Sequence, residues 1–213
     1  GGHSTAGYSI NDGLVVDLSG LGYVVVDPER RQAIVGAGTN FGHLNAVLDG
    51  YKLHVPSGGC EDVCVGGYMQ GGGFGFTSRE YGINCDNVIE ALVLLADGGL
   101  VKASATVNAP LFWAIRGGTG NNFGVLLQTT YRLHPLWQIC GFGLRWSLDD
   151  APAALVAMQQ GYMRSGASAR LGYMTVITLQ EGGQQWLLMR GVYEGTPAQA
   201  LSGDLDGNRR RDI

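Results

Sequence analysis

Three glycine-rich segments hold the side chains of this sequence that are best suited to chemistry. They are residues 1–4 (GGHS), residues 56–75 (PSGGCEDVCVGGYMQGGGFG) and residues 116–125 (RGGTGNNFGV). Consecutive glycine N–H groups in turns form anion-binding nests, which suit a pyrophosphate better than a neutral ligand. For any one segment, glycines that merely form turns explain the pattern equally well. The three segments together predict a nucleotide-binding site.

Two common nucleotide-binding motifs do not fit these segments. No segment is followed by GKS or GKT, so none of them is a Walker loop. The glycines of residues 35–42 (VGAGTNFG) are spaced one residue too widely for the dinucleotide fingerprint GxGxxG. The sequence therefore argues against a Rossmann domain.

The composition narrows the class of protein. Glycine accounts for 36 of 213 residues, charged residues for 15%, and the net charge is −4. Such a chain has no basic stripe for phosphate backbones, which argues against nucleic acid as a partner. No run of about 18 apolar residues occurs, so we expect no membrane helix and a soluble protein, either cytoplasmic or secreted. The four cysteines form no metal-type CxxC pair, so we expect neither a metal site nor a disulfide framework.

Short β-branched runs between Gly, Pro and Asp predict the strands that must position these segments. In the first part of the chain they cover residues 14–18, 23–27, 32–35, 87–96, 100–104 and 123–133. Thr39 or Asn40 can cap a helix whose apolar side chains share one face and which stops at Gly50. The turn at residues 97–99 (DGG) predicts a hairpin, and residues 109–116 predict a second helix.

A new series of elements begins near Pro135. It comprises a strand over residues 141–146, a helix over 151–163 opened by Asp149 or Asp150, and strands over 171–179 and 185–193. Strand, helix and paired strands predict an α+β fold. We therefore place a first domain at residues 1–135 and a second at 136–213.

The order of the motifs resembles the berberine bridge enzyme-like flavoproteins over about residues 1–135. The series is GGHS, GLVVDLSGL, VGAG, PSGGCEDVCVGG, GGGFGFTSREYG, CDNV, ADGG, LFWAIRGGTGNNFGV and YRLHP. The resemblance implies the FAD-binding fold shared with vanillyl-alcohol oxidase, in which two α+β subdomains precede a substrate domain on an antiparallel sheet. Residues 1–135 would then be the second part of the FAD-binding domain, with its N-terminal part missing. Residues 136–213 would begin the substrate-binding domain, with its C-terminal part missing.

The resemblance also implies a doubly covalent FAD. His3 matches the histidine that bonds to the 8α-methyl carbon of the flavin, and Cys60 matches the cysteine that bonds to flavin C6. A thiolate is a good nucleophile, and Gly58 and Gly59 would let the backbone approach a flat ring. Without the resemblance, His3 would be taken as a solvated surface residue and Cys60 as a buried structural cysteine. The other implied cofactor-binding residues are Gly1, Gly2, Ser4, Gly59, Val63, Gly67, Tyr68, Gly72 and Val88.

Two of these residues have a second interpretation. Val63 falls where the family side chain controls the access of dioxygen to reduced flavin, and Val resembles the permissive version. It would equally well fill a core. Tyr68 falls where other members carry His or Tyr near the flavin, so its phenol could contact cofactor or substrate. Cys64, Cys85 and Cys140 have no such match and are expected to be small buried apolar side chains.

The function implied is that of an FAD-linked oxidase acting on a small molecule such as an alcohol, a carbohydrate or a natural product. Hydride would pass to flavin N5, and dioxygen would reoxidise the flavin. A dehydrogenase of the same fold that does not use dioxygen, and a non-catalytic FAD-binding remnant, are the alternatives. The catalytic base of the family lies beyond the matched motifs, so the sequence names no catalytic residue.

Overall fold

A computed structural model describes residues 3–118, 120, 122–163, 167–179 and 183–202 of the chain. The chain divides into two compact units, Gly1–Leu136 (unit 1) and Trp137–Ile213 (unit 2). Both units combine helices with antiparallel strands, which confirms the predicted α+β class. Within the described residues, no helix combines the length and the apolar character needed to cross a membrane.

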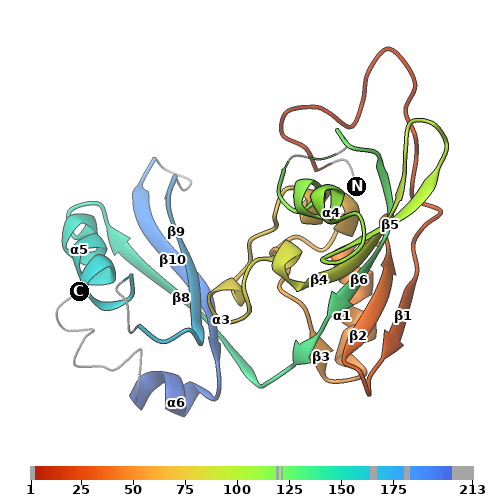
Figure 1. The fold of residues 1–213 in the computed structure, drawn as a ribbon. Helices are drawn as coiled ribbons and strands as arrows, with labels where there is room; N and C mark the ends of the chain where they lie inside the picture. The colour runs from red at the N-terminus through yellow and green to blue at the C-terminus, as the bar shows by residue number, and fades with distance from the viewer. Residues whose placement is uncertain (1–2, 119, 121, 164–166, 180–182, 203–213) are drawn as a thin grey trace. The chain divides into compact units, whose positions relative to one another are not determined.

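Unit 1 is built on a five-stranded antiparallel sheet (Figure 1). In spatial order its strands are β1 (Val24–Asp27), β2 (Gln32–Gly36), β6 (Val125–Arg132), β4 (Val88–Leu94) and β5 (Leu100–Ser104). β4 and β5 form the hairpin predicted from the DGG turn, in which Gly98 has φ +83° and Asp97 accepts a hydrogen bond from the N–H of Gly99. A glycine meets this positive φ without strain.

Helix α1 (Phe41–Asp49) confirms the predicted first helix. The side chain of Asn40 caps its start by accepting a hydrogen bond from the N–H of His43 at 2.8 Å, and the helix ends at Gly50. Such a cap satisfies one of the N–H groups that have no partner within the helix. The other elements of unit 1 are β3 (Leu53–His54), α2 (Val65–Gln70), α3 (Ser78–Tyr81), η1 (Asn84–Asn87), α4 (Ala109–Ile115) and β7 (His134–Pro135).

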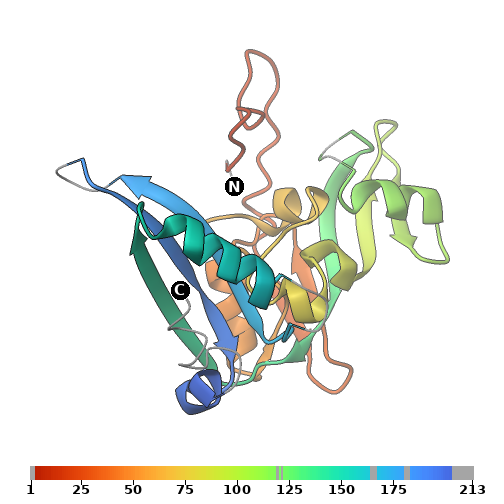
Figure 2. The same cartoon turned by 90° about the vertical axis from the view of Figure 1, so that its left-hand side faces the viewer.

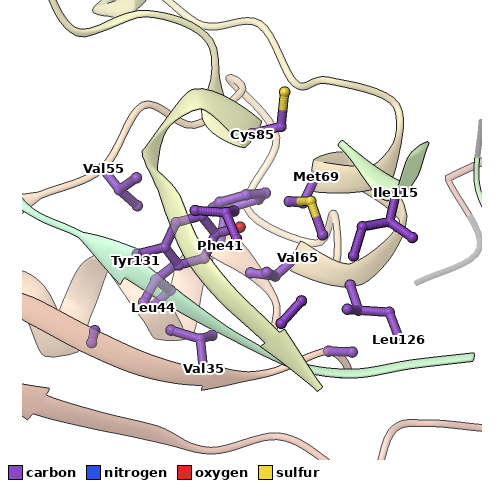
Figure 3. Packing of buried hydrophobic residues seen from close by; sticks show 14 of the residues in the cluster. Val35, Phe41, Leu44, Val55, Val65, Met69, Cys85, Ile115, Leu126 and Tyr131 are labelled. Carbon is purple, nitrogen blue, oxygen red and sulfur yellow. The ribbon is translucent and has the colours of Figure 1, made fainter. Parts of the chain in front are cut away.

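The core of unit 1 lies between the sheet and the helices. Figure 3 shows Phe41 and Leu44 of α1 gathered near Tyr131 of β6, with Val65 and Met69 of α2 close by. All five side chains are fully buried. Burying a side chain of this size stabilises a fold by roughly 1.5–3 kcal/mol. The core therefore fixes α1 and α2 firmly against the sheet.

The predicted strand at residues 14–18 is wrong, because this stretch has no strand pairing and forms a loop. Leu14 is 85% exposed, and Val15 and Val16 are also exposed. Figure 2 shows the N-terminal stretch projecting from the rest of unit 1. Strand propensity describes how well a side chain fits a half-buried pleated surface, and here only Leu18 packs against the core.

Unit 2 is a three-stranded antiparallel sheet in the order β8 (Ile139–Ser147), β10 (Gln185–Glu194) and β9 (Leu171–Leu179). Helix α5 (Ala151–Gly161) lies across one face of this sheet (Figure 2) and buries Ala154 and Met158 against it. A short helix, α6 (Pro197–Ser202), follows β10. The predicted strands and helix of this part are confirmed, with small shifts of their ends.

Candidate functional site

Cys60 lies in the loop between β3 and α2, and its thiol is free and exposed. Backbone contacts hold the loop on both sides of it, because the carbonyl of Glu61 accepts from the N–H of Gly42 at 2.9 Å and the carbonyl of Pro56 accepts from the side chain of Asn84 at 2.8 Å. The thiol of Cys85 differs: it is buried, and burial raises its pKa. Cys60 is therefore the more accessible nucleophile of the two.

The glycines around Cys60 fall into two groups, according to what a Cβ atom would meet. At Gly59 and Gly67 a Cβ would have nothing within 4 Å, and both residues are exposed. At Gly73 a Cβ would lie 2.4 Å from Cε1 of Tyr68, and at Gly75 it would lie 1.9 Å from the carbonyl oxygen of Ser57. The second group is needed for internal packing. The first group leaves the backbone open to solvent next to Cys60 and next to Tyr68 in the sequence.

Part of the second glycine-rich segment is helical, whereas its glycine pattern indicates turns. Gly66 and Gly67 belong to α2, and a Cβ on Gly66 would lie 2.9 Å from the carbonyl oxygen of Ala37. A residue larger than glycine would therefore push α2 away from the residues that follow β2. The close approach of backbone to backbone is the physical reason for a glycine in this helix.

Tyr68 packs inside the segment. Its hydroxyl donates a hydrogen bond to the carbonyl of Phe74, its ring meets the ring of Phe41 edge to face at 4.8 Å, and its Cε2 would lie 3.2 Å from a Cβ on Gly58. Burial raises the pKa of Tyr68 to about 12, so the phenol is a hydrogen-bond donor at neutral pH. In this structure Tyr68 packs against the turn before Cys60 and stabilises it.

The second and third glycine-rich segments lie against each other. The N–H of Gly117 donates to the carbonyl of Gln70 at the end of α2, at 3.1 Å. Arg116 donates from Nη1 to the carbonyl of Cys85 at 3.3 Å, and its guanidinium lies 4.3 Å from the centre of the Phe112 ring. The structure thus brings together two of the three segments that the sequence singled out.

The remaining predicted cofactor-binding residues differ in their exposure to solvent. His3 and Ser4 are exposed at the start of the N-terminal loop, whereas Gly1 and Gly2 lie outside the described residues. No hydrogen bond among the described residues joins the side chain of His3 to Cys60. Val63, Gly72 and Val88 are buried; Gly72, with φ +96°, accepts from the N–H of Cys85, and the side chains of Val63 and Val88 belong to the core.

Two residues of the site were not foreseen from the sequence. Asn84 and Tyr131 are both fully buried and hydrogen-bonded to each other, and Asn84 also binds the carbonyl of Pro56. The only sequence signal for Asn84 would have been the polar residues at 84, 86 and 87, immediately before the apolar run of β4. Among the described residues no cluster of three or more His, Cys, Asp or Glu side chains could hold a metal ion.

Comparison with known proteins gives a family for this arrangement. A family model described as "FAD binding domain" matches residues 1–104. The chain is 43% identical to a xylooligosaccharide oxidase of Thermothelomyces thermophilus over 62% of its length and 27% of the relative's. It is 33% identical to a carbohydrate oxidase of Microdochium nivale over 93% of its length and 41% of the relative's.

A solved structure agrees with this assignment. Berberine bridge enzyme from Eschscholzia californica superposes with a TM-score of 0.82 at 28% identity, covering 96% of this chain and 43% of that one. The chain thus spans less than half the length of these relatives. On the matched domain and the shared fold, residues 1–104 are an FAD binding domain similar to that of the berberine bridge enzyme-like FAD-linked oxidoreductases.

Proposed function

We propose that this chain holds FAD covalently through His3 and Cys60, as part of an oxidase that acts on a hydroxyl-bearing small molecule. The observation that carries the proposal is the exposed thiol of Cys60, which follows a glycine with open space above it. A covalent bond to a flat ring needs both a free nucleophile and a backbone without a Cβ in the way. The FAD binding domain matched over residues 1–104 supplies the ligand class.

Both links obey the same balance of atoms and electrons. At Cys60 the S–H bond and the C6–H bond of the ring break, and a bond forms between sulfur and C6. At His3 an imidazole N–H and one C–H of the 8α-methyl group break, and a bond forms between nitrogen and carbon. Each link releases two protons and two electrons, which dioxygen takes up as hydrogen peroxide.

When bound, FAD would supply the redox step by accepting a hydride at N5 and passing two electrons to dioxygen. The residues of this chain would hold the flavin ring in position. Cys60 and His3 would fix the ring at two points, and the open surfaces at Gly59 and Gly67 would let it lie close to the backbone. Two fixed points remove rotational freedom that a singly bound ring would keep, which favours a reactive alignment.

The substrates we propose are alcohols, carbohydrates or natural products that carry a hydroxyl group. Two of the relatives are named for carbohydrates, a xylooligosaccharide oxidase and a carbohydrate oxidase. Oligosaccharides are therefore the first substrates to test.

Turnover of the full-length gene product under air tests the oxidase proposal. Xylo-oligosaccharides and simple alcohols would be supplied as substrates, with hydrogen peroxide and remaining substrate both measured. We expect one peroxide for each substrate oxidised. Oxidation with an artificial electron acceptor but no peroxide under air would identify a dehydrogenase instead, and no flavin in the protein would contradict the proposal altogether.

A further inference from the structure

We propose that Asn84 is a positioning residue for Cys60, acting through the backbone of residues 56–60. This inference rests on the proposed covalent role of Cys60. Asn84 lies 24 residues after Cys60, just before β4. Its position in the sequence alone does not suggest this role. Its hydrogen bonds are what connect it to the nucleophile.

Asn84 joins three segments through one fully buried side chain and its own backbone. Its Nδ2 donates to the carbonyl of Pro56 at 2.8 Å, and its Oδ1 accepts from the hydroxyl of Tyr131 at 2.8 Å. Its N–H donates to the carbonyl of Gly73, also at 2.8 Å. Tyr131 is fully buried on β6, in the sheet of unit 1. The amide therefore ties the first residue of the glycine-rich segment to a rigid strand.

The turn that carries Cys60 is hydrogen-bonded at both of its ends. On its C-terminal side the carbonyl of Glu61 is fixed by the N–H of Gly42 at the start of α1. On its N-terminal side Pro56 is fixed by Asn84. Between these two points the contacts are the packing of the Tyr68 ring against Gly58 and a longer hydrogen bond, 3.4 Å, from Asn45 to the hydroxyl of Ser57. Losing the Asn84 contact would release one of the two fixed ends of the turn.

Bond formation is sensitive to such a release. The sulfur must come within reach of ring carbon C6 along a narrow range of directions, and a displacement of about 1 Å can slow a reaction about 100-fold. A buried amide that is hydrogen-bonded on both sides has one orientation, because turning it would leave buried polar groups without partners. Asn84 is thus suited to set the position of Pro56 and, through it, of Cys60.

The test measures how fast each covalent link forms. Full-length gene product from riboflavin-starved cells would be mixed with FAD under air and quenched in acid at intervals, and flavin peptides would be quantified by mass spectrometry. The variants are Asn84→Leu, which removes both side-chain contacts at similar volume, and Tyr131→Phe, which removes only the hydroxyl that orients the amide. Link formation consumes one dioxygen and yields one hydrogen peroxide per bond, so oxygen is kept saturating.

The matched control is Asn87→Leu. Asn87 is also buried, but its Nδ2 donates to the carbonyls of Tyr81 and Ile83, and its Oδ1 contacts His134. This control removes an equally buried amide without touching residues 56–75.

We expect the Cys60 link to form about 10- to 100-fold more slowly in Asn84→Leu, and about 3- to 10-fold more slowly in Tyr131→Phe. The His3 link should keep its rate within about twofold in both, as should both links in Asn87→Leu. If Asn84 only stabilised the fold, the variants would form both links more slowly, in proportion to the fall in their thermal unfolding temperature. If Asn84→Leu does not fold, Tyr131→Phe decides.

The inference would be overturned if the folded variants formed the Cys60 link at the parental rate, or if Asn87→Leu slowed that link as much as Asn84→Leu does. Either result would leave the covalent proposal intact. An unmutated protein without a flavin on Cys60 would overturn the covalent proposal, and this inference with it.

Discussion

The hydroxyl of Tyr68 donates a hydrogen bond to the backbone carbonyl of Phe74, six residues further along the chain. The bond closes the turn that leads out of α2 and holds the Tyr68 ring against Gly58, two residues before Cys60. The position of Tyr68 is therefore set by its own segment and by the ring of Phe41 in α1.

Tyr68→Phe should keep the ring packing and lose the bond to Phe74. We expect the free energy of unfolding to fall by about 0.5–1.5 kcal/mol, the usual net value of one hydrogen bond. The parent should also lose stability as the pH rises from 10 towards 12, because the folded-state pKa of Tyr68, about 12, lies above its usual 10. Urea denaturation at pH 8 and pH 11 measures both effects. An equal alkaline loss in Tyr68→Phe would show that other groups cause it.

Alanine should have different effects at Gly73, where it should lower the stability of the fold, and at Gly59, where it should slow flavin attachment. Gly73→Ala places a Cβ 2.4 Å from the Tyr68 ring at φ +76°, so we expect a loss of about 3 kcal/mol or more in unfolding free energy. Gly59→Ala points its Cβ into open space and should change stability by no more than about 0.5 kcal/mol. It should nevertheless slow flavin attachment at Cys60. Chemical denaturation and flavin-peptide analysis measure the two effects, and normal attachment in Gly59→Ala would contradict the ring approach proposed here.

Two histidines of unit 1 should make it sensitive to acid. His54 and His134 pair across β3 and β7, and Tyr81 stacks on His134 at 4.2 Å and meets His54 edge to face at 5.0 Å. Burial lowers the pKa of His54, and burial, His54 and Arg132 lower the pKa of His134 to about 4, whereas Glu80 acts in the opposite direction on both.

A depressed folded-state pKa means that this stability is present above pH 6.5 and is lost as the pH falls towards 4. Because His134 is only half buried, we expect a loss on the order of 1–2 kcal/mol. His54→Phe should lose less stability in acid, since it removes one of the two groups with a lowered pKa, together with the charge of His54 that helps to lower the pKa of His134. Unfolding free energies at pH 7.5 and pH 4.5 provide the test, in which identical acid losses for parent and variant would exclude the histidine pair as the cause.

Val63→Leu separates packing from oxygen access. Val63 is 8% exposed and lies in the core of unit 1, so the added methylene should lower the unfolding free energy by about 1–3 kcal/mol. We also predict slower reoxidation of the reduced protein by dioxygen, because Leu leaves less room over the ring. Stopped-flow reoxidation decides: equal rates for parent and variant would make Val63 a packing residue only.

The sequence predicts the elements whose signals are local. Asn40, the spacing of Phe41 and Leu44, and Gly50 together mark α1, and the DGG turn marks the β4–β5 hairpin. α2 was missed because Gly66 and Gly67 weaken any helix pattern. The strand at residues 14–18 failed because propensity does not supply a pairing partner.

The candidate site divides in the same way. Cys60 was singled out by the resemblance of its glycine-rich motif, whereas the residue type alone indicated a buried cysteine; the structure shows an exposed thiol. The support of Pro56 by Asn84 spans 28 residues, and the bond between Asn84 and Tyr131 spans 47. No local sequence pattern encodes such contacts, because these residues become neighbours only when the sheet folds.

Mass spectrometry of flavin peptides from the full-length gene product tests the central claim most directly. After acid precipitation and proteolysis, we predict flavin on the peptide with His3 and on the peptide with Cys60, while His3→Ala and Cys60→Ala each retain the other link. Flavin released entirely into the acid supernatant of the unmutated protein would contradict the account.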